Sequence, residues 1–118
     1  MPQITVDYSE QLAEGFDRRG FARGLHEAVV EIAAAKYEAC KTQFRATQDT
    51  TVGLDEDGHA VVHVTLGLLA GRSDETKLRL TETVLELLRQ YVKPAEGIAL
   101  HASAEVRDLD PSYRKFES

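Results

Sequence analysis

Several residue types are scarce in this sequence, and each scarcity excludes a class of protein. The 118 residues include one Cys, no Trp and three Pro. A lone cysteine, Cys40, cannot form an internal disulfide and is typical of a reducing compartment. No apolar run approaches the ~20 residues that cross a bilayer, and residues 1–4 lack the basic and apolar regions of a secretion signal. We therefore expect a cytoplasmic protein with no membrane partner.

Positive charge is also scarce. The chain has 14 Lys and Arg against 20 Asp and Glu, a formal net charge of −6. The basic residues are dispersed, with no basic tail or arginine-rich arm, so a phosphate-backbone binder is not indicated and no nucleic-acid partner is expected. A chain of this length buries roughly two-thirds of its unfolded surface without disulfides or metals. One domain over residues 1–118 is therefore predicted.

The first half of the chain predicts strand, helix and strand. Residues 2–8 alternate between apolar and polar, which is typical of a half-buried strand. Asp17 can cap a helix that ends near Lys36. The apolar stripe of this helix recurs at steps of three and four residues and comprises Phe21, Leu25, Ala28, Val29 and Ile32. Residues 41–52 are again extended, and the Asp55-Glu56-Asp57-Gly58 cluster then predicts a turn.

The second half repeats this order. Residues 59–69 alternate strongly and predict a strand. Ser73 is a natural helix cap, and Pro94 and Gly97 mark the end of the helix that follows. The stripe of that helix comprises Leu78, Thr81, Val84, Leu85, Leu88 and Val92. Residues 98–106 predict the final strand, and a polar extension follows from Asp108.

The two halves, about 2–52 and 59–107, therefore form a duplicated βαβ unit. Right-handed crossovers would give an α+β fold with a four-stranded mixed sheet and both helices on one face. The residues of the opposite face are small, polar or histidine, with Val61 and Val52 as apolar exceptions. That composition suits a sheet face covered by other subunits, so we predict a homo-oligomer.

Pro2 is the first candidate for chemistry. Methionine aminopeptidases readily remove Met1 before proline, which would leave a chain that begins with a secondary amine. An α-amino group titrates near pH 8, and burial or neighbouring cations lower its pKa further. Such a group can act as a general base near neutrality. The alternative is that Pro2 merely fixes φ at the start of an edge strand.

The second set of candidates consists of cations. Arg72 precedes a helix N-terminus, where anions are favoured, and its guanidinium could hold a carboxylate with two hydrogen bonds. Alternatively, it is a surface arginine paired with Asp74 or Glu75. Lys41, Gln43 and Arg45 share one face of their strand and could face an anionic ligand, or they could form a solvated strand face.

A metal site is not indicated. His59 and His63 are four residues apart, and in a strand this separation spans roughly 13 Å, too far for one ion. Cys40 has no partner at zinc spacing. His63 is better explained as a histidine packed in the sheet. Motifs of nucleotide binding or acyl-enzyme chemistry are also missing.

Three segments together carry a family resemblance. They are Met1-Pro2-Gln3-Ile4-Thr5-Val6-Asp7-Tyr8-Ser9, Val62-His63-Val64-Thr65-Leu66 and Ala70-Gly71-Arg72-Ser73. With this spacing, the sequence resembles the 5-carboxymethyl-2-hydroxymuconate Δ-isomerases of the tautomerase superfamily over roughly residues 2–107. The resemblance implies a homotrimer of doubled βαβ units, with the sheets inside and the helices outside.

The resemblance also implies an activity. Family members ketonise an anionic dienol produced by aromatic ring cleavage, without a metal or a cofactor. Their catalytic base is the amino-terminal proline, here Pro2, and a substrate-binding arginine matches Arg72. The second family arginine matches either Lys41 or Arg45, with Arg45 favoured.

Other functions remain open. Another tautomerase-superfamily reaction, such as hydration or dehalogenation, is one alternative. The other is a non-catalytic trimeric module that binds a small acid.

Overall fold

The computed structural model describes all residues, 1–118, and contains one mixed sheet. Its strands are β1 (Gln3–Ser9), β2 (Lys41–Thr47), β3 (His59–Leu68) and β4 (Ala99–Asp108). Their order across the sheet is β2-β1-β3-β4. Pairing is parallel within each half and antiparallel between β1 and β3 in the centre. This arrangement confirms the predicted α+β fold with a duplicated βαβ order.

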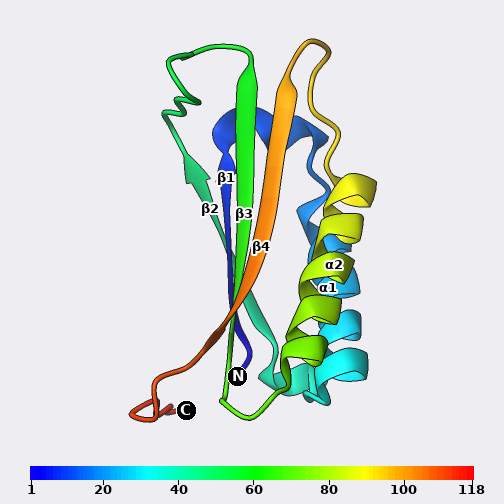
Figure 1. Cartoon of the computed structure of the whole chain (residues 1–118), viewed down its shortest axis with the longest axis vertical. Coiled ribbons are helices and arrows are strands. Elements are labelled where there is room, and N and C mark those ends of the chain that lie inside the picture. The colour runs from blue at the N-terminus through cyan, green and yellow to red at the C-terminus, as the bar shows by residue number, and fades with distance from the viewer.

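The helices α1 (Arg18–Ala33) and α2 (Asp74–Tyr91) lie side by side on one face of the sheet (Figure 1). Both predicted caps are confirmed. The Asp17 carboxylate accepts a hydrogen bond from the Gly20 backbone N–H at 3.0 Å, and Ser73 Oγ accepts one from the Thr76 N–H at 3.1 Å. These bonds satisfy N–H groups that a helix start would otherwise leave unpaired.

The core lies between the sheet and the helices. The β1 and β3 side chains that were predicted to face inward are buried, as are Phe21, Leu25 and Val29 of α1. In α2 the buried row is Leu80, Val84 and Leu88. Leu78, predicted as part of that stripe, is instead 59% exposed. The reason is geometric, since Leu78 lies about 120° around the helix from Val84 at 3.6 residues per turn.

Three element ends differ from the predictions by two residues or more. Helix α1 stops at Ala33 rather than near Lys36, because Ala34 adopts a left-handed conformation with φ 58°. Strand β2 ends at Thr47, and Val52 instead pairs with Asp55 within the following loop. Strand β4 runs to Asp108, two residues beyond the expected end. Two short 3-10 helices, η1 (Glu10–Gly15) and η2 (Tyr37–Ala39), complete the chain.

The chain ends meet at one end of the sheet. The N-terminus, the connection from β3 to α2 and the segment after β4 all lie at the lower end in Figure 1. No helix is both long enough and apolar enough to cross a membrane. This lower end of the sheet therefore carries Pro2 and the segment that contains Arg72.

Candidate active site at the amino-terminal end of the sheet

Pro2 is buried directly before β1. Its carbonyl oxygen accepts a hydrogen bond from the Lys41 backbone N–H at 3.3 Å. The next residue, Gln3, is in register with Lys41 on one side and Gly67 on the other. Pro2 therefore lies between the start of β2 and the end of β3, so the sheet holds it from both sides.

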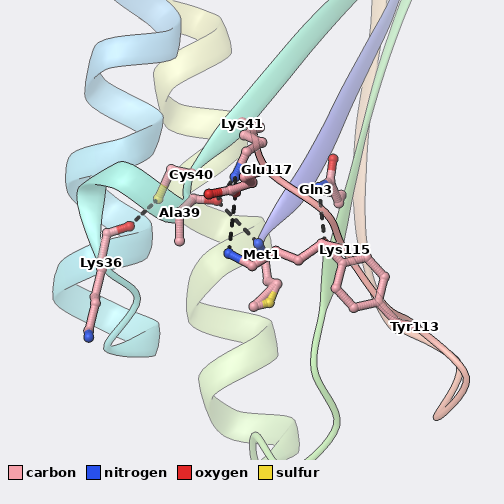
Figure 2. Close-up of polar contacts among 9 residues, drawn as sticks. All are labelled: Met1, Gln3, Lys36, Ala39, Cys40, Lys41, Tyr113, Lys115 and Glu117. Carbon is pink, nitrogen blue, oxygen red and sulfur yellow. Dashed lines mark hydrogen bonds and ion pairs between the residues drawn. The ribbon is translucent and has the colours of Figure 1, made fainter.

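The terminal amine sits in surroundings that disfavour its charged form. The Met1 ammonium donates a hydrogen bond to the Ala39 carbonyl at 3.2 Å (Figure 2). Burial lowers the pKa of this amine, and the positive charges of Lys41 and Lys115 lower it further. Cys40 and Glu117 act in the opposite direction and do not reverse the shift. An amine whose pKa is lowered in this way is a better base near neutrality.

Lys41 is the predicted cation that lies beside this amine. Its Nζ donates to the Ala39 carbonyl at 3.5 Å, the same oxygen that binds the Met1 amine. It also forms an ion pair with Glu117 at 3.3 Å. The structure thus brings Lys41 and the chain terminus together around one carbonyl group.

Arg72 lies at the same end of the sheet and is half-buried. It follows Gly71, whose φ of 124° favours glycine. Its guanidinium donates from Nη2 to the Ala33 carbonyl at 2.9 Å and from Nη1 to the Leu69 carbonyl at 3.1 Å. The expected alternative, a pair with Asp74 or Glu75, is wrong, because the side chain turns back toward the end of α1. There it satisfies a helix carbonyl that has no partner within the helix.

Arg45 is placed differently. It forms a bidentate pair with Asp7 across the β1–β2 register, with N···O distances of 2.7 and 3.1 Å. The hydrogen bonds and negative charge of Asp7 raise the pKa of Arg45. Four residues of strand, about 13 Å, separate it from Lys41. Within a single chain, Lys41 therefore lies beside Pro2 and Arg45 lies farther along the exposed face.

His59, His63 and His101 form hydrogen bonds on the face of the sheet away from the helices, whereas Nε2 of His26 in α1 lies 2.8 Å from Thr42 Oγ1. His63 is half-buried, with Nδ1 2.6 Å from Ser103 Oγ and Nε2 2.9 Å from Glu105 Oε2. Hydrogen bonds from Arg107 and then His63 lower the pKa of Glu105. His63 is thus satisfied within the sheet, as the sequence predicted. The parallel register of β3 and β4, which sets these partners, is not visible in the sequence.

Three contributors to the site were missed by sequence reasoning. Tyr113, Lys115 and Glu117 belong to the polar extension after β4, which returns to the N-terminus (Figure 2). The contacts of Tyr113 with Gln3 and of Glu117 with Lys41 span more than 70 residues of chain, and no local pattern signals them. Lys115 joins them through its ion pair with Glu117. Two hollows on the chain surface lie elsewhere. One runs from Glu14 to Asp17 and along Gln90, Tyr91 and Lys93, and the other lies between α2 and β4.

The sequence of this chain matches a known protein family over nearly its whole length. The family model of 5-carboxymethyl-2-hydroxymuconate isomerase matches residues 2–117. The chain belongs to this family. Membership agrees with the resemblance carried by Pro2 and the Arg72 segment, and it supports an isomerase activity of the tautomerase type. No curated protein matches the chain significantly.

Solved structures agree on the fold. A 5-carboxymethyl-2-hydroxymuconate isomerase from Deinococcus radiodurans R1 is 19% identical with a TM-score of 0.79, covering 98% of this chain and 90% of that one. A malonate semialdehyde decarboxylase inhibited by 3-bromopropiolate is 25% identical with a TM-score of 0.66, covering 99% and 90%. A fused 4-OT, described as a wild-type symmetric trimer, is 14% identical with a TM-score of 0.78, covering 98% and 94%. This chain therefore has the same fold as these solved structures.

Proposed function

We propose that this family member is a cofactor-independent isomerase that ketonises a carboxylated 2-hydroxymuconate-type dienol, with Pro2 as the general base. The observation that carries the proposal is the environment of the terminal amine. Pro2 is buried, and the amine beside it has its pKa lowered by burial and by Lys41 and Lys115. Removal of Met1 would transfer the terminal amine to Pro2 within the same surroundings.

The proposed reaction moves one proton and leaves the atom count unchanged. The Pro2 nitrogen takes the proton of the 2-hydroxyl group, and the oxygen lone pair forms the ketone. The double bonds shift along the conjugated chain toward a distant carbon. The protonated Pro2 then returns a proton to that carbon, so the base is regenerated without a redox step.

The cations have a distinct role, because negative charge develops on the substrate oxygen while the substrate already carries carboxylates. We propose that Arg72 and Lys41 hold these charges, both lying at the same end of the sheet as Pro2. Preorganised donors at a developing oxyanion lower the barrier, since they need no reorganisation during the reaction. A net charge of −6 makes such local cations necessary for an anionic substrate.

We also propose a homotrimer in the cytoplasm. The face of the sheet opposite the helices carries the Asp7–Arg45 pair and the His63 hydrogen bonds and has no covering element in the chain. The fused 4-OT of similar fold is described as a symmetric trimer, and neither surface hollow of this chain includes Pro2 or Arg72. A neighbouring subunit would complete the site, and Arg45 would reach substrate only across such an interface.

Replacement of Pro2 tests the proposed base. The ultraviolet ketonisation rate of a 2-hydroxymuconate-type dienol should fall in Pro2→Ala, and its pH optimum should shift, since a primary amine is more basic. Intact mass must show that both proteins have lost Met1. An unchanged pH–rate profile would point to another base.

A second reaction is favoured by one comparison. The malonate semialdehyde decarboxylase is 25% identical to this chain, against 19% for the Deinococcus radiodurans isomerase. Decarboxylation of a small oxo acid is therefore the alternative reaction, and a panel containing dienols and malonate semialdehyde separates the two. A chain that retains Met1 and turns over neither substrate would instead be a binding module.

A further inference from the structure

The segment that follows β4 is fixed to the sheet before it reaches the amine. The Leu109 N–H donates to the Leu68 carbonyl at 2.7 Å. Its side chain lies against Gly67, where a Cβ would come within 2.9 Å of Leu109 Cδ2. Asp110 then forms a turn, accepting from the Ser112 and Tyr113 N–H groups at 2.8 and 2.9 Å. These contacts direct residues 113–118 back toward the N-terminus.

The returning segment places a carboxylate between two ammonium groups. Glu117 Oε2 lies 3.3 Å from Lys41 Nζ and 3.3 Å from Lys115 Nζ (Figure 2). Upstream, Tyr113 Oη accepts a hydrogen bond from Gln3 Nε2 at 3.3 Å. One carboxylate oxygen is therefore shared by two lysines beside the chain terminus, so this space accommodates the group that an anionic substrate presents.

We propose that Lys41 and Lys115 form a substrate-carboxylate site, and that Glu117 is its resident counter-ion, displaced when a substrate carboxylate binds. The inference rests on the proposed function for the identity of the substrate. It adds Lys115 as a binding residue and assigns the C-terminal segment a part in substrate affinity. Neither role follows from the Pro2 and Arg72 motifs.

The solvent exposure of these three side chains favours replacement of the Glu117 carboxylate by a substrate carboxylate. The side chains of Lys41, Lys115 and Glu117 are 41%, 46% and 55% exposed. Ion pairs as exposed as these are held weakly, because water and salt screen both charges. A free dicarboxylate also carries a second charge, for which the proposed function assigns Arg72, whereas the Glu117 side chain carries one. The Glu117 carboxylate is therefore held weakly enough to be replaced by a substrate carboxylate.

Binding of trans,trans-muconate, an unreactive dicarboxylate, tests the inference by calorimetry at low ionic strength. Glu117→Gln should tighten muconate binding about two- to fivefold, which is the range of one exposed ion pair. The matched control Glu96→Gln removes the same charge at the opposite end of the molecule and should leave binding unchanged. Equal affinity of Glu117→Gln and Glu96→Gln would overturn the role of Glu117.

Lys115 is tested in the same way. Lys115→Gln should weaken muconate binding several-fold relative to Lys93→Gln, a control at the far end of α2. Equal affinities of these two variants would overturn the two-lysine site. Calorimetry reads binding without turnover, so the expected shifts together with a failed ketonisation assay would refute the proposed reaction and support the carboxylate site.

Discussion

Arg72 joins two parts of the structure, and its replacement by alanine should have two separable effects. The guanidinium donates to the Ala33 and Leu69 carbonyls at 2.9 and 3.1 Å. Hydrogen bonds from charged donors contribute about 1.5–3 kcal/mol each when buried. Arg72 is only half-buried, so water replaces part of this energy. We expect Arg72→Ala to lower the free energy of unfolding by roughly 1–3 kcal/mol in total.

The second effect is on catalysis. If Arg72 also holds a substrate carboxylate, its loss removes a charge-assisted contact, and kcat/KM should fall by about 2–3 kcal/mol, or roughly 30- to 150-fold. Arg72→Lys should retain part of the activity, because the charge remains but the two-pronged geometry is lost.

Two assays separate these effects. Urea unfolding at fixed chain concentration measures stability, since an oligomer would make stability depend on concentration. Ultraviolet ketonisation kinetics measure kcat/KM on protein shown to be folded. Arg79→Ala, which removes an exposed arginine of α2, is the control and should change neither quantity. Unchanged kinetics in Arg72→Ala would remove Arg72 from the site, and unchanged unfolding would refute its role at the end of α1.

Three further changes test the site and its support. Lys41→Gln should move the rising limb of the kcat/KM pH profile to higher pH, because the Lys41 charge lowers the pKa of the Met1 amine and should act in the same direction on a Pro2 amine, which must be unprotonated to act; a limb that stays in place would contradict this. Ser73→Ala should lower the urea unfolding free energy by about 1 kcal/mol through loss of the α2 cap, whereas Ser73→Asp should restore it. Gly67→Ala should force Leu109 to shift, costing about 1 kcal/mol, and make residues 109–118 more sensitive to protease; unchanged protection would argue against this anchor.

The sequence is most informative where a local pattern decides the structure. Alternation alone located β1 and β3, and Asp17 and Ser73 were recognised as caps because one side-chain oxygen satisfies a nearby N–H. The bare face of the sheet followed from the polar alternation of the same strands. Each of these features depends on residues within a few positions of one another.

The remaining features depend on distant contacts. No Gly or Pro marks the end of α1 at Ala33. The Arg72 guanidinium, 39 residues away in the sequence, donates a hydrogen bond to the Ala33 carbonyl there. The sequence favours Arg45 over Lys41 as the second cation, whereas the β1–β2 register places Lys41 beside Pro2 and Arg45 opposite Asp7. The segment carrying Glu117 looked like a polar extension, because its partners lie at the start of the chain.

The proposed proton transfer depends on a free imino group at Pro2, and this dependence can be measured. It is tested most directly by measuring dienol ketonisation on two samples verified by intact mass. One sample begins at Pro2, and the other retains Met1 because it was produced with methionine aminopeptidase inhibited. We expect turnover only in the sample that begins at Pro2, since Met1 converts the Pro2 nitrogen into an amide. Equal turnover by the two samples would contradict it.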